Sequence, residues 1–200
     1  MKSYIIINKN IYEKYKDEVL SLNARLFCEP YFYQLENYQP PFDLTGLEKY
    51  IKYIQEIEIL SSSTFLDFIN ILLLLSFLKS VDYKEKIIIN YYILKKNHLK
   101  EALFSQVTLT SKDYEKIDDL LNDIKNKKIV QKIDIQLPGI LNYINFYNLM
   151  HDSEKFLFSL QDIIEEYDED IYQIAFYLQE KYSNMGFNQE FYLEYLKKYL

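Results

Sequence analysis

One helical segment constrains this chain more than any other: residues 65–79, FLDFINILLLLSFLK, are apolar on nearly every side. A helix that exposes one face to water keeps polar residues on that face, so this helix must be covered by other elements all round. Asp67 and Asn70 interrupt the apolar run, and the run is shorter than the ~20 residues that span a bilayer. We therefore expect a buried core helix rather than a membrane segment.

The segments on either side of this helix have the composition of β-strands. Residues 57–60 come before it, and residues 86–93 (KIIINYYI) follow it with β-branched side chains on both faces, as in strands buried in parallel sheets. Shorter β-rich runs at 4–7, 25–28 and 107–109 predict further strands, the last of them at an edge. Longer amphipathic runs alternate with these strands, so the first 110 residues predict βαβ units and a mainly parallel sheet.

Helices are expected between the predicted strands. Three of them lie at residues 11–22, 95–104 and 111–124. Thr45 and Glu48 have the spacing of a capping box, in which the hydroxyl and the carboxylate each bind a backbone N–H of the first turn. This box predicts another helix that ends near Glu56.

The last third of the chain carries only helical patterns. Residues 125–132 (KNKKIVQK) favour a linker by composition, although 129–135 also fit an edge strand protected by charged side chains. After Pro138 and Gly139, helices are expected at residues 140–150, 153–167, 170–182 and 188–200. Gly186 fits a C-terminal cap and Asn188 the N-cap that follows it.

Together these patterns predict an α/β fold. We expect a mostly parallel open sheet of four to five strands flanked by helices, formed by residues 1–126. An all-helical C-terminal subdomain follows in residues 138–200. The sequence predicts no oligomeric state.

The negative charge of the chain lies in its C-terminal part. The formal net charge is −7, and residues 151–200 hold eleven acidic side chains against four lysines, which accounts for all of it. Arg25 is the only arginine among 23 basic residues, so phosphate clamping and guanine recognition are poorly provided for. We therefore expect no nucleic-acid partner and no membrane partner.

The rare residue types exclude several classes of site. The chain has only 3 glycines, Gly46, Gly139 and Gly186, which lie too far apart for a dinucleotide-binding loop, a phosphate-binding P-loop or a nucleophile elbow. Its single cysteine, Cys28, cannot form an intrachain disulfide, and the N-terminal MKSYIIINKN has too short an apolar stretch for a signal peptide. A reducing cytoplasm is the expected location, and the Tyr-, Ile-, Lys- and Asn-rich usage is typical of an AT-rich genome.

Polar residues gather where the predicted parallel strands end, which is where open α/β sheets bind ligands. The candidate ligand-binding residues are Asn8, Asn10, Ser61, Ser62, Ser63, Thr64, Asp67 and Asn90. Hydroxyls and backbone N–H groups at a helix N-terminus favour an anion, and the Asp67 carboxylate would suit a hydroxyl or a metal. The same residues are also ordinary helix caps, and the cap is the more common role.

No set of residues predicts catalysis. Cys28 stands beside Glu29, but no histidine lies nearby in the sequence to activate the thiol. His98 and His151 lack the spacing of a zinc site. The sequence therefore predicts no catalytic residue, no metal and no cofactor.

Residues 57–78 resemble a bacterial domain-of-unknown-function family, family 1835. Its members have a strand followed by a Glu-His-Asp-Leu-Tyr-Asp-Gln-like turn that opens a leucine-rich helix, where this chain has SSTFLDF and then INILLLLSFL. Similarity continues in 86–90, in 109–117 (LTSKDYEKI) and in 137–144 (LPGILNYI). The chain departs from the family at Asn8-Lys9-Asn10, where members have Gly-Asp-Ser, and at Ser63-Thr64, where they have His-Asp. The resemblance implies a divergent member and carries no established activity.

Three functional hypotheses follow. The favoured one is a cytoplasmic protein that binds a small molecule or a protein without catalysing a reaction. An alternative is an enzyme, or a degenerate enzyme, that acts on a phosphorylated small molecule at the turn between Ser61 and Asp67. A further alternative is a protein-interaction module that uses the acidic C-terminal helices and exposes an apolar groove in residues 138–200.

Overall fold

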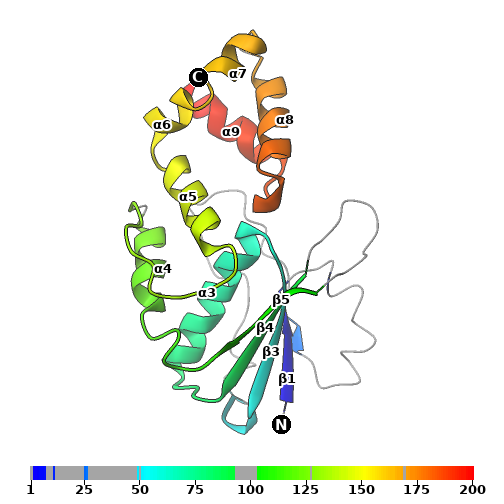
Figure 1. The fold of residues 1–200 in the computed structure, drawn as a ribbon, viewed down its shortest axis with the longest axis vertical. Helices are drawn as coiled ribbons and strands as arrows, with labels where there is room; N and C mark the ends of the chain where they lie inside the picture. The colour runs from blue at the N-terminus through cyan, green and yellow to red at the C-terminus, as the bar shows by residue number, and fades with distance from the viewer. Residues whose placement is uncertain are drawn as a thin grey trace.

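The computed structural model describes residues 2–7, 11, 25–26, 49, 51–92, 103–126, 128–168 and 170–200. These residues form an α/β fold, in which an open sheet comes first along the chain and a helical part follows (Figure 1). The predicted fold class is confirmed.

The sheet has five strands in the order β2-β1-β3-β4-β5. They are β1 (Lys2–Ile6), β2 (Arg25–Leu26), β3 (Glu56–Ser62), β4 (Lys86–Tyr92) and β5 (Leu103–Leu109). The first four strands in this list are mutually parallel, and β5 runs antiparallel to β4. Each of the five lies at a predicted strand, and β3 and β5 are longer than predicted.

The antiparallel edge strand corrects one predicted helix. A helix over residues 95–104 is wrong at its end, because Leu103 and Phe104 belong to β5. Only residues 93–102 separate β4 from β5, and a parallel neighbour needs a crossover of about a dozen residues or more. The short connection therefore favours an antiparallel return, and the rest of that predicted helix lies outside the described residues.

The apolar helix is the centre of the fold. It is α3 (Phe65–Ser80), which lies along one face of the sheet in Figure 1. Strand residues Ile57, Ile59 and Ile87 are fully buried in the same core as α3. Helix α4 (Ile117–Lys125) packs against α3 as well, so the core helix expected from the sequence is confirmed. Among the described residues, no helix has the length and apolar character needed to cross a bilayer.

Two further predicted helices differ from the structure at their ends. Of the helix expected to end near Glu56, the described residues show a 3-10 turn, η2 (Ile51–Tyr53). Glu56 begins β3 instead, because Glu and Ile alternate there with the period of a strand. Thr45 and Glu48 lie outside the described residues. The helix expected from residue 111 starts at Ile117. Before it, the Asp113 carboxylate accepts hydrogen bonds from the Thr110 N–H (2.6 Å) and hydroxyl (2.7 Å), which favours a turn.

The helix expected over residues 153–167 is two shorter helices, α6 (Ser153–Phe158) and α7 (Gln161–Glu166). The break lies at Ser159, whose hydroxyl donates to the Phe156 carbonyl, and at Leu160, which is fully buried. A serine hydroxyl that binds a preceding carbonyl bends or ends a helix. Burial of Leu160 in the turn then changes the direction of the chain.

Residues 128–138 form neither helix nor strand, but they are packed. The linker predicted at 125–132 therefore agrees with the structure from Lys128 on, whereas Lys125 still belongs to α4, and the alternative edge strand at 129–135 is not formed. Val130, Ile135 and Leu137 are buried. The Asn148 side chain accepts from the Val130 N–H and donates to the Val130 carbonyl, both at 2.9 Å. This segment is therefore fixed to the helices that follow it.

The C-terminal helices lie beyond the end of the sheet at which the parallel strands finish (Figure 1). They comprise α5 (Ile140–Met150), α6, α7, α8 (Ile171–Lys181), a 3-10 turn η3 (Ser183–Met185) and α9 (Gln189–Tyr199). The Phe65 ring at the start of α3 lies 5.8 Å from Phe146 and 5.9 Å from Phe187, centroid to centroid. As predicted, Gly186 follows η3 in a left-handed conformation, and the Asn188 side chain caps α9.

Candidate functional site

The predicted turn between β3 and α3 is built from hydrogen bonds among its own residues. Asp67 Oδ2 accepts from the Ser62 N–H at 2.8 Å and also from the Ser62 hydroxyl. Thr64 is the N-cap of α3, and its Oγ1 accepts from the Asp67 N–H at 3.3 Å. The Ser63 N–H donates to the Tyr92 carbonyl at 3.2 Å, at the end of β4. The sequence forms these contacts because small hydroxyl residues follow a strand directly and an acid lies in the first helical turn.

This turn is also covered. Ser61, Ser62 and Asp67 are buried, with Asp67 only 5% exposed. A Cβ placed on Gly186 would lie 3.1 Å from the Thr64 Cβ, so the segment after η3 lies directly against the cap. The segment at Gly186 thus covers the α3 cap at the carboxyl end of β3, which is the end of the strands where open α/β folds bind ligands.

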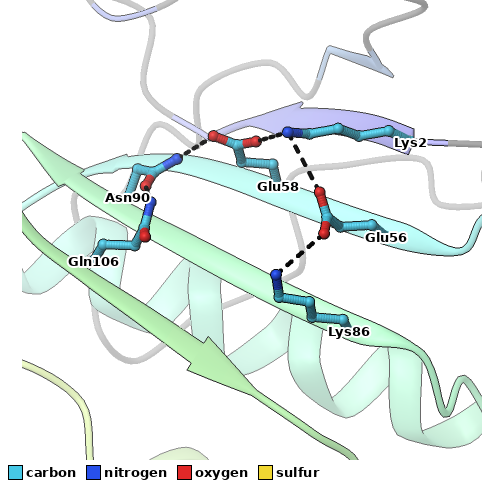
Figure 2. A network of polar contacts seen from close by, with 6 residues as sticks. All are labelled: Lys2, Glu56, Glu58, Lys86, Asn90 and Gln106. Atoms are coloured by element: carbon cyan, nitrogen blue, oxygen red, sulfur yellow. Dashed lines mark hydrogen bonds and ion pairs between the residues drawn. The ribbon is translucent and has the colours of Figure 1, made fainter.

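The structure brings only some of the predicted site residues together. Ser61, Ser62, Ser63, Thr64 and Asp67 form the turn, whereas Asn8 and Asn10 lie outside the described residues. Asn90 pairs in register with Leu60, and its side chain takes part in a different polar network (Figure 2).

This second network crosses the sheet from β1 to β5. Its residues are Lys2, Glu56, Glu58, Lys86, Asn90 and Gln106 (Figure 2). Glu58 binds Lys2 Nζ through Oε2 at 2.5 Å and accepts from Asn90 Nδ2 through Oε1 at 2.5 Å. Gln106 Nε2 donates to Asn90 Oδ1 at 2.7 Å. Four strands are therefore tied together by side chains on one face.

Ion pairs extend the network to the amino ends of the parallel strands. Lys2, Glu56 and Lys86 are direct neighbours in register, and both lysines lie 3.3 Å from Glu56. Desolvation alone would raise the pKa of Glu56, but hydrogen bonds from Lys86 and Lys2 outweigh it and hold that pKa below its ordinary value. The hydrogen bond to Glu58 is the main reason that the pKa of Lys2 is raised.

The position of this network indicates a structural role. Ligands of open α/β sheets bind at the carboxyl ends of the strands, whereas these ion pairs lie at the amino ends. Glu56 lies between Lys2 and Lys86 on neighbouring strands. Because opposite charges attract across strands and like charges repel, this row favours a single strand register. Sequence reasoning missed Glu58 and Gln106, although the alternation of Glu and Ile in residues 56–59 places both glutamates on one face.

Two further titratable residues, His151 and Asp118, have local partners. His151 Nδ1 lies 2.9 Å from the Tyr147 carbonyl, and its ring lies 4.2 Å from the Tyr147 ring. Asp118 accepts from Ser76 at 2.6 Å and from Lys79 at 2.7 Å. Within the described part of the chain, no group of three or more His, Cys, Asp or Glu side chains is placed to hold a metal ion.

A pocket of about 340 Å³ lies on the C-terminal helices. Its lining residues are Tyr167, Tyr172, Gln173, Phe176 and Gln189. Tyr172 is 60% exposed and Phe176 is 57% exposed, although both are large aromatic side chains. Helix α8 positions them because its buried face is Ile174, Ala175 and Leu178, so residues 172 and 176 fall on the opposite side.

Two glutamines complete the lining. Gln189 Nε2 donates to the Tyr172 carbonyl at 3.0 Å, and Gln173 Nε2 donates to Asp170 Oδ2 at 3.1 Å. The Asp170 carboxylate caps α8 and its pKa lies below the ordinary value, because the Gln173 side chain and the Gln173 and Tyr172 N–H groups donate to it. The sequence contained a signal for this pocket, namely two aromatic residues four apart on the polar face of a helix.

Comparison with known proteins adds no relative. The chain matches no protein-family model, no curated protein and no solved structure. The resemblance to family 1835 therefore stays a prediction from the residues that carry it.

Proposed function

We propose that this protein is a non-catalytic binding protein, and that its binding surface is the aromatic pocket of the C-terminal helices. The observation that carries the proposal is the pocket itself, in which Tyr172 and Phe176 expose more than half of their surface beside Tyr167. Exposed aromatic side chains in a concavity are typical anchoring sites of protein partners. The net charge of −7 agrees with a protein partner, and the single cysteine agrees with a reducing cytoplasm.

The contacts of the β3–α3 turn favour this proposal over an enzyme at that turn. The hydroxyl and the N–H of Ser62 both donate to Asp67, and the cap on α3 is Thr64. An anion there would have to compete with Asp67 for these donors and to displace the segment at Gly186. The same contacts are what a structural cap requires.

A peptide-display selection tests the pocket. The full chain is immobilised and presented with a random peptide library on phage, and enriched peptides are then measured against variants. We expect enriched peptides to lose about tenfold in affinity with Tyr172→Ser or Phe176→Ser, because anchoring aromatic residues carry most of the binding energy in such sites. Phe158→Ser is the matched control, since Phe158 is 80% exposed on α6 and does not line the pocket.

A substrate screen tests the absence of catalysis. The chain is incubated with pools of nucleotides, sugar phosphates and acyl esters, alongside Asp67→Asn. We expect no turnover that depends on Asp67. Reproducible turnover that Asp67→Asn abolishes, or enriched peptides that bind the pocket variants as well as the wild type, would overturn the proposal.

A further inference from the structure

We propose, on the basis of the proposed function, that the pocket binds an arginine or lysine side chain from a basic segment of a partner protein. The inference goes beyond the existence of a binding surface to the chemistry of its occupant. Three features of the pocket carry this proposal: its aromatic residues, the hydrogen bonds of its two glutamines and the charge around it.

The aromatic lining suits a cation. Three of the five lining residues are Tyr167, Tyr172 and Phe176. Arg and Lys cations bind over the faces of such rings within about 6 Å. The chain already uses this contact nearby, because Lys181 Nζ lies 5.5 Å from the Tyr177 ring and 5.6 Å from the Tyr182 ring. Among the cation–aromatic contacts of the described residues, none involves the three pocket rings.

The polar lining also suits a hydrogen-bond donor. A backbone carbonyl and a carboxylate only accept hydrogen bonds, so the side chains of Gln189 and Gln173 must face Tyr172 O and Asp170 Oδ2 with their nitrogens. This orientation is fixed by chemistry and leaves Oε1 of each glutamine able to accept a hydrogen bond. A guanidinium group, with five N–H donors and no acceptor, is complementary to such a lining.

The surrounding charge selects a basic partner. Between Gln161 and Glu190 the chain carries eight acidic side chains and one basic side chain, Lys181. Glu165, Glu166 and Asp168 are exposed and immediately precede or follow Tyr167. This charge attracts a basic segment and repels the phosphates of a nucleic acid.

Fluorescence anisotropy with matched peptides tests the inference. The probes are short glycine- and serine-flanked peptides that differ at one central position, which is arginine, lysine, citrulline or norleucine. Citrulline keeps the shape of arginine without its charge. We expect citrulline and norleucine to weaken binding by about tenfold relative to arginine, the size of a partly desolvated cation–aromatic contact.

Variants of the chain separate the contributions. Phe176→Leu keeps an apolar side chain but removes the ring face, so it should weaken the arginine peptide about fivefold or more and leave the norleucine peptide nearly unchanged. Asp168→Asn with Glu166→Gln should weaken the arginine peptide and reduce its dependence on salt. Phe158→Ser should leave binding unchanged, because this exposed ring lies outside the pocket lining.

The outcomes are distinguishable from a failure of the proposed function. Equal binding of the arginine, citrulline and norleucine peptides, lost with Phe176→Ser, would overturn the cationic occupant and leave a binding pocket for apolar side chains. If no probe peptide binds, and display-selected peptides are also insensitive to Tyr172→Ser and Phe176→Ser, both the inference and the proposed function are wrong.

Discussion

Asp67 accepts two hydrogen bonds from Ser62 through one carboxylate oxygen while it is almost fully buried. Asp67→Asn should therefore lower the free energy of unfolding by about 1.5–3 kcal/mol, the usual worth of hydrogen bonds to a charged group. Ser62→Ala should have a smaller effect because the backbone N–H of residue 62 still donates to Asp67, and the double variant should lose less than the sum, since both changes affect the contact of the Ser62 hydroxyl. Urea denaturation of the variants measures these values. If Asp67→Asn is as stable as the wild type or more stable, the Asp67 carboxylate serves a function instead of stabilising the turn.

Gly186 occupies a backbone conformation that other residues rarely adopt, with φ at +86°. Gly186→Ala should lower the free energy of unfolding by about 1–2 kcal/mol, because the left-handed conformation is unfavourable for a residue with a Cβ. The added Cβ would also lie 3.1 Å from the Thr64 Cβ. Gly186→Asn separates the two causes, since Asn tolerates the conformation but still carries the Cβ. An unchanged urea midpoint for Gly186→Ala would contradict the close contact between this segment and the α3 cap.

At the scale of elements, aromatic side chains of the C-terminal part pack against the N-terminal end of α3. Phe187 contacts the rings of Phe65, Phe146 and Phe191, at centroid distances of 5.9, 5.8 and 3.9 Å. Phe187→Ala should lower the free energy of unfolding by about 3–5 kcal/mol, as is typical when a buried phenylalanine is truncated.

Phe158→Ala is the matched control for this prediction. Because Phe158 is 80% exposed, its truncation should change stability by less than about 0.5 kcal/mol. Equal effects of the two substitutions in urea denaturation would mean that the C-terminal helices do not stabilise α3.

The elements also show how far the sequence alone can be taken. The α/β fold class, the strand at 86–93 and the core helix at 65–79 follow from strong apolar periodicity, and the structure has all three. The failures occur where local geometry opposes periodicity: the Thr110–Asp113 turn delays α4, and the buried Leu160 divides the helix expected at 153–167. Strand β5 is antiparallel because its connection to β4 is short. The residue pattern in 95–104 does not indicate this direction.

The candidate site was harder to predict than the fold. The sequence identified the serines before α3, but not that Asp67 takes up the Ser62 donors or that Gly186 lies against Thr64. Gly186 and Thr64 lie more than a hundred positions apart, and the Ser62–Asp67 contact depends on the local geometry of the turn, so periodicity carries no information about either. By contrast, the spacing of Tyr172 and Phe176 is local, so an exposed aromatic face on this helix could have been found in the sequence, although we did not identify it there.

At the scale of the whole molecule, buried tyrosines connect stability to alkaline pH. Burial is the main reason that the pKa of Tyr143 and that of Tyr147 are raised from 10.0 to about 12, and it raises the pKa of Tyr91 further. The folded state therefore keeps protons that the unfolded chain loses above its pKa of 10.0. The resulting stability is complete below about pH 10 and is lost as the pH rises toward the folded values.

Urea denaturation across this pH range, with tyrosinate absorbance recorded in parallel, checks the prediction. The buried Tyr91, Tyr143 and Tyr147 should ionise together with unfolding. The Tyr91 hydroxyl is buried and has no hydrogen-bond partner among the described residues, so Tyr91→Phe should raise stability most at high pH. Smooth ionisation of all tyrosines without a change in stability would contradict the packing described for the core.

The binding pocket itself is tested most directly by mapping backbone amide NMR shifts while the arginine-centred peptide is titrated into the full chain. The account predicts saturable shifts centred on Tyr172, Phe176 and Gln189, with the amides of Ser62 and Asp67 unmoved. Shifts centred on Ser62, Thr64 and Asp67, with the α8 amides unmoved, would contradict it and place ligand binding at the carboxyl ends of the strands.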